Sequence, residues 1–129
     1  MTMDRRQFLL VVGATAAATA ATAGCAPGAD YTGDALARPA LLDVLGADHV
    51  RAIGKRYCET TRDERHERTI RTAILDSRPF GARFLGVRSP SIADLVRADF
   101  ANGRTVVVDG WVLATTEARQ CALFSLRSA

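Results

Sequence analysis

The segment that most constrains the fold lies at residues 105–113. Two β-prone runs, Thr105-Val106-Val107-Val108 and Trp111-Val112-Leu113, flank the dipeptide Asp109-Gly110. An Asp-Gly pair between two such runs is typical of a β-hairpin with a two-residue type I′ turn. Because an isolated hairpin is unstable in water, we expect this one to pack on helices.

The rest of the chain from residue 36 on repeats apolar side chains at helical intervals. Five helical segments are predicted, at residues 36–45, 48–60, 61–78, 91–101 and 115–126. The third is expected to begin at Thr61-Arg62-Asp63-Glu64, which has the spacing of a capping box, and the fourth to bury Phe100 in its apolar stripe. The sequence therefore predicts a mainly α domain of about five short helices with one small β-hairpin at residues 105–113.

The first 25 residues form a different kind of segment. Arg5 and Arg6 precede Phe8 and Leu9, and an apolar run rich in Ala, Thr and Val follows. This pattern resembles the twin-arginine (Tat) signal, a receptor-read export address that is removed from the mature protein. The resemblance implies export to the periplasmic side of the cell envelope. A permanent membrane helix is the alternative, although the run is short and weakly apolar for a span of about 20 residues.

The end of this segment offers two cleavage sites. The sequence Thr22-Ala23-Gly24-Cys25 resembles a lipobox, which implies that Cys25 becomes the lipidated first residue and ties the protein to a membrane. Ala21-Thr22-Ala23 also fits an ordinary A-x-A site, which would leave Cys25 as a free thiol. We favour lipidation, because an exposed unpaired thiol is a liability in an oxidising compartment.

These features divide the chain into a signal peptide at 1–25, a flexible tether at 26–35 and a single small domain at 36–129. Roughly 100 residues after the leader are enough for one core and not for two. The formal charge of +3 includes Asp4, Arg5 and Arg6, so the mature chain carries 3 − 1 = +2. A charge this small gives no argument for nucleic-acid binding.

Two cysteines remain in the mature domain if Cys25 carries lipid. Cys58 and Cys121 could form a disulfide, which in the chain-entropy model would stabilise the domain by roughly 4 kcal/mol across a loop of about sixty residues. The alternative is two reduced thiols that pack as small hydrophobic groups. The sequence leaves both open.

No motif for catalysis, a cofactor or a metal is found in the mature sequence. His66 lies among acidic residues without a second His at ligand spacing, and the glycines at 81 and 86 lack the Lys-Ser/Thr of a phosphate loop. Cys58 lies on an apolar helical face, which does not suit a nucleophile. We therefore expect no catalytic residue, no cofactor and no metal ligand.

The connection before residue 90 is unusually apolar for a loop. Aromatic and arginine side chains are typical anchors of protein interfaces. We therefore expect a partner surface built from this loop and the hairpin tryptophan, comprising Phe80, Arg83, Phe84, Leu85, Arg88 and Trp111.

The overall layout suggests a role without naming a reaction. A Tat-like leader before a small helical domain that lacks a cofactor motif is similar to the small subunits of exported, membrane-associated flavin dehydrogenases. The resemblance implies a non-catalytic accessory protein or small subunit whose partner is a larger exported enzyme, with an oxidoreductase favoured. A free-standing envelope lipoprotein is the alternative, and a small enzyme of unknown reaction is a further one.

Overall fold

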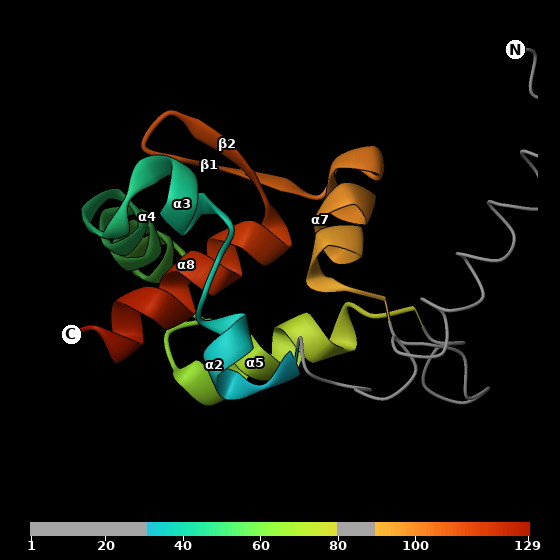
Figure 1. The fold of residues 1–129 in the computed structure, drawn as a ribbon, viewed down its shortest axis with the longest axis horizontal. Coiled ribbons are helices and arrows are strands. Elements are labelled where there is room, and N and C mark those ends of the chain that lie inside the picture. Colours follow the sequence, from blue (N-terminus) through green and yellow to red (C-terminus); the bar gives the residue numbers. More distant parts are fainter. Residues whose placement is uncertain (1–30, 80–89) are drawn as a thin grey trace, which may run out of the picture.

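The computed structural model describes residues 31–79 and 90–129, and this part of the chain is mainly helical with one β-hairpin (Figure 1). The predicted fold class is therefore confirmed. The described elements, in order, are α2 (Gly33–Leu36), α3 (Leu41–Leu45), α4 (Ala47–Thr60), α5 (Glu67–Asp76), α7 (Ile92–Ala101), β1 (Thr105–Val108), β2 (Trp111–Ala114) and α8 (Thr115–Arg127).

Helix α8 runs through the middle of the molecule, and the other elements pack around it (Figure 1). Its closest neighbour is α4, which approaches it at Gly54. A Cβ atom at Gly54 would lie 2.0 Å from the carbonyl oxygen of Cys121, so the contact requires glycine. The α8 side of the core consists of small and medium apolar side chains, all fully buried: Ala118, Cys121, Ala122 and Leu123.

Helices α2 and α5 cover a second side of α8, and α7 packs near its N-terminal end (Figure 1). Ile70 and Ile74 of α5 and Leu36 of α2 are fully buried. Leu95 fixes α7 to the same core. The four helices α2, α4, α5 and α7 thus share one core with α8.

The hairpin forms as predicted. Strands β1 and β2 pair antiparallel, with Val108 opposite Trp111 on either side of the turn. Asp109 and Gly110 have φ angles of 49° and 84°, the two positive values that a type I′ turn needs. Val108 and Leu113 lie on the buried face of the hairpin, which packs on the helices.

Three local expectations are wrong. Helix α5 begins at Glu67 and not at Thr61, because Thr61 accepts a turn hydrogen bond from the Glu64 N–H and the extended backbone of His66 precedes the helix. Phe100 is 47% exposed, since α7 turns the neighbouring Asp99 inward.

The third difference concerns the expected tether at residues 26–35. Its last residues belong to the packed domain, because Thr32 caps α2 by accepting a hydrogen bond from the Ala35 N–H at 3.2 Å. Tyr31 packs partly buried against the core. The part of the tether left outside the described domain is therefore 26–30.

Candidate functional site

Most of the residues expected to carry function lie outside the described part of the chain. These are the signal residues Arg5, Arg6, Phe8 and Leu9, the lipidation candidate Cys25, and the loop residues Phe80, Arg83, Phe84, Leu85 and Arg88. The structure describes Cys58, Cys121 and Trp111.

The hairpin presents apolar side chains to solvent. Val107 and Val112 are directly opposed on the two strands, so they share the outer face of the sheet, and they are 71% and 60% exposed. Trp111, beside the turn, is 45% exposed. Because Trp111 pairs with Val108, it lies on the other face of the sheet. We call the outward face formed by Val107 and Val112 the hairpin surface. Of these exposed apolar residues of the hairpin, only Trp111 was predicted from the sequence to belong to a partner surface. The apolar residues Val107 and Val112, one in each predicted strand, were a further signal of exposed apolar area.

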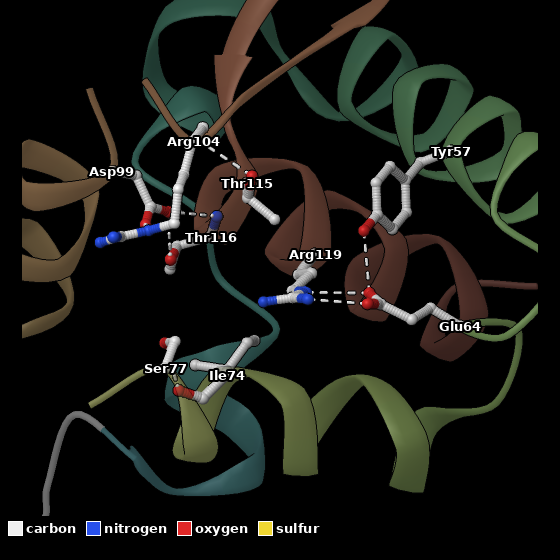
Figure 2. Close-up of polar contacts among 9 residues, drawn as sticks. All are labelled: Tyr57, Glu64, Ile74, Ser77, Asp99, Arg104, Thr115, Thr116 and Arg119. Atoms are coloured by element: carbon white, nitrogen blue, oxygen red, sulfur yellow. Dashed lines mark hydrogen bonds and ion pairs between the residues drawn. The ribbon is translucent and has the colours of Figure 1, made fainter. Parts of the chain in front are cut away.

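The hairpin is held to the helices at both ends. Near the turn, Arg56 Nε of α4 lies 3.5 Å from Asp109 Oδ1. At the other end, the backbone N–H and the hydroxyl of Thr115 both donate to the carbonyl oxygen of Arg104, at 3.1 and 3.0 Å (Figure 2). The hairpin surface is therefore fixed relative to the core before any partner binds.

A buried carboxylate joins α7 to the start of α8 (Figure 2). Asp99 is 3% exposed, and its Oδ2 accepts hydrogen bonds from the Thr116 N–H at 2.8 Å and from the Thr116 hydroxyl at 2.7 Å. Arg104 Nε donates to Oδ1 at 2.9 Å. The N-cap of α8 is Ala114, which has no side-chain acceptor, so Asp99 supplies the negative charge that a helix N-terminus favours.

A second polar cluster joins α4, the 61–66 connection and α8 (Figure 2). Arg119 donates to both oxygens of Glu64, with Nε and Nη2 at 2.8 and 2.7 Å, and the Tyr57 hydroxyl donates to Glu64 Oε2 at 2.8 Å. The hydrogen bond from Arg119 lowers the pKa of Glu64, and burial raises the pKa of Tyr57 to about 12.

The two polar clusters are explained by the elements that they join, without a catalytic role. At neutral pH the Glu64 carboxylate is paired with a guanidinium and the Tyr57 phenol stays protonated, so neither is set up as a general base. Sequence reasoning missed both Asp99 and Arg119. A signal existed for Asp99, because it stands four residues after Leu95 on the apolar face of its helix.

The two cysteines of the domain are free thiols in the structure. Cys121 is buried, and burial raises its pKa to about 12, while the partly exposed Cys58 has its pKa raised by burial as well. Of the two alternatives left open by the sequence, the structure contains the reduced pair. A disulfide in the exported protein stays a prediction.

Residues 31–79 and 90–129 contain neither a metal-binding cluster nor a membrane-spanning helix. No group of three or more His, Cys, Asp and Glu side chains within these residues is arranged to hold a metal ion. None of the helices in the same ranges combines the length and the apolar character that crossing a membrane requires.

The chain was also compared with known proteins. No family model, no curated protein and no solved structure matches it.

Proposed function

We propose that this protein is an exported, membrane-tethered, non-catalytic accessory protein or small subunit of a larger enzyme of the cell envelope, with an oxidoreductase as the favoured partner. The Tat-like leader and the lipobox-like Cys25 support export and tethering. The hairpin surface supports a role in binding another protein.

The observation that carries the binding role is the exposed Val107–Val112 pair. Two β-branched side chains that face each other on a fixed hairpin lose little conformational entropy when a partner covers them. Trp111, half exposed on the other face of the hairpin beside the turn, is of the residue type most enriched among the energetically important residues of interfaces. A small apolar area of this kind fits the centre of an interface whose remaining contacts are polar.

Export and tethering are tested on the signal residues. Replacing Arg5 and Arg6 by lysine should strand the precursor in the cytoplasm, because a Tat receptor reads the arginine pair and not positive charge alone. Normal export of that variant would refute the Tat reading. Cys25→Ser should move the protein from the membrane fraction to the soluble or uncleaved fraction, and membrane association equal to that of the parent would refute lipidation.

The binding role is tested on Val107→Ser/Val112→Ser. Both side chains are exposed, so this variant should keep its melting temperature but lose binding to any larger exported oxidoreductase that co-purifies with the parent protein. Val44→Ser is the matched control, since Val44 is 78% exposed on α3, outside the hairpin surface. Unchanged binding of the double variant would refute this surface, and a parent protein that binds no such enzyme would favour the free-standing lipoprotein.

A further inference from the structure

The first described residues after the tether pack against α5. The Tyr31 hydroxyl donates a hydrogen bond to the Pro90 carbonyl oxygen, and the Arg78 guanidinium lies 5.0 Å from the centroid of the Tyr31 ring. A Cβ on Gly33 would lie 3.6 Å from Cζ of Arg71. The point at which the tether enters the domain is therefore fixed beside α5.

The tether is too short to let the domain turn freely above a membrane. Five residues, 26–30, separate Cys25 from Tyr31. Even fully extended, the chain between these two residues spans at most about 20 Å. A lipid on Cys25 would therefore hold the α2 and α5 side of the domain close to the phospholipid headgroups.

This side of α5 carries an open hollow of about 420 Å³. The described residues that line it all belong to α5: Glu67, Arg68, Arg71, Thr72 and Leu75. The Glu67 carboxylate is already bound, because its Oε1 accepts from Arg127 Nε at 3.1 Å and from Nη2 at 2.8 Å. The two arginines are then the charges that the hollow offers to a ligand.

Arg71, which lines the hollow, carries an unsatisfied donor. Its Nε is buried and has no hydrogen-bond partner within the described part of the chain. A buried donor without a partner is costly. A phosphate bound at this guanidinium would supply a charge-assisted acceptor. A second guanidinium comes from Arg68, one turn of helix before Arg71, and a hydroxyl comes from Thr72, the next residue; both line the same hollow.

We propose that the α5 face, defined as Arg68, Arg71, Thr72 and Leu75, binds anionic phospholipid headgroups of the membrane in which Cys25 is anchored. The proposal rests on the proposed lipidation of Cys25. It also orients the protein: the hairpin lies on the opposite side of α8 from α2 and α5, so the hairpin surface faces away from the membrane, where a partner can reach it (Figure 1).

The first test removes the proposed lipid on Cys25 and keeps the α5 face intact. A chain that begins at position 25 with Cys25→Ser contains every described helix and strand in one core. It should co-sediment with phosphatidylglycerol vesicles and not with phosphatidylcholine vesicles. Arg68→Gln/Arg71→Gln should weaken this binding about 25-fold, at about fivefold per arginine.

The matched control is Lys55→Gln/Arg97→Gln, which removes the same charge from exposed positions of α4 and α7. Equal weakening by both pairs would mean unspecific attraction and would overturn the proposal. Absence of vesicle binding would also overturn the proposal, and so would binding of inorganic phosphate without binding of vesicles. Should the loss of Arg71 unfold the domain, Arg68→Glu compared with Arg97→Glu gives the same test, because Arg68 and Arg97 are both exposed.

The second test measures orientation in the lipidated protein. Trp111 is the sole tryptophan of the sequence. In vesicles with nitroxide-labelled headgroups its fluorescence should stay unquenched, whereas a tryptophan introduced by Thr72→Trp in a Trp111→Phe background should be quenched. Failure of the parent to sediment with vesicles would refute lipidation. Sedimentation with Trp111 quenched and position 72 unquenched would refute the α5 face alone.

Discussion

Replacing Asp99 should destabilise the domain more than any other single loss of charge described above. Asp99→Ala leaves the N–H and the hydroxyl of Thr116 buried without an acceptor. Hydrogen bonds to a charged group contribute about 1.5–3 kcal/mol each, so the loss of two of them costs about 3–6 kcal/mol. The loss stays near the lower end because the third partner, Arg104, is 52% exposed and can turn to water.

A loss of this size is a large fraction of the roughly 5–15 kcal/mol available to a domain of about 100 residues. The melting temperature should fall by more than about 10 °C, and the midpoint of urea unfolding should fall with it. The melting temperature of Asp99→Asn should lie between those of the parent protein and Asp99→Ala, since the amide oxygen can still accept one of the two hydrogen bonds from Thr116.

The control is another aspartate on the same helix. Asp94 belongs to the solvent-exposed capping box of α7 with Ser91 and also pairs with Arg97 at 2.8 Å. Asp94→Ala should lower the melting temperature much less than Asp99→Ala. If Asp94→Ala and Asp99→Ala have the same melting temperature, Asp99 does not hold α7 to the start of α8 in the way described.

Three more predictions concern the α4–α8 contact and the side chains around it. Gly54→Ala should cost about 3 kcal/mol in chemical denaturation, because its Cβ would meet the Cys121 carbonyl oxygen at 2.0 Å, while Lys55→Ala on the exposed side should be nearly neutral. The pKa of Glu64 is lowered from about 4.5, so the contribution of its carboxylate to stability is complete above that pH and is lost as the pH falls through the lowered pKa. Glu64→Gln should therefore flatten the acid side of a plot of unfolding midpoint against pH. An unchanged plot would contradict the ion pair with Arg119. In the folded, reduced protein an alkylating reagent should modify Cys58 before the buried Cys121, and mass spectrometry showing the reverse order would contradict the burial described here.

The features that the sequence predicted correctly are local ones. The hairpin turn depends on two neighbouring residues, Asp109 and Gly110, and their positive φ angles follow from residue type. The capping box of Ser91 and Asp94 likewise involves residues three apart, and both of its hydrogen bonds are present. Short-range chemistry of this kind depends little on the rest of the fold.

The features that the sequence missed depend on partners far along the chain. Asp99 takes the buried place expected for Phe100 because Thr116, seventeen positions later, needs an acceptor. The helix predicted to begin at Thr61 does not start there, and the Glu64 carboxylate instead accepts hydrogen bonds from Arg119, at a separation of 55 residues. A local pattern cannot show which of two neighbouring residues a distant donor will select.

The same limit applies to the candidate site. The sequence placed Trp111 on a partner surface, and the structure shows it 45% exposed. The apolar character of Val107 and Val112 is visible in the sequence, but only the pairing register shows that both face outward. The cationic character of the hollow along α5 could not be predicted, because Arg127 pairs with the carboxylate of Glu67 across 60 residues of chain.

The central position of α8 determines when the protein can fold. It follows every other described element in the chain, yet α2, α4, α5, α7 and the hairpin all pack on it or on the core that it completes. A growing polypeptide has no complete core until α8 has left the ribosome, and a product that stops before Thr115 has none at any time. If export uses a translocase that accepts folded proteins, truncated chains would remain in the cytoplasm as substrates for proteases.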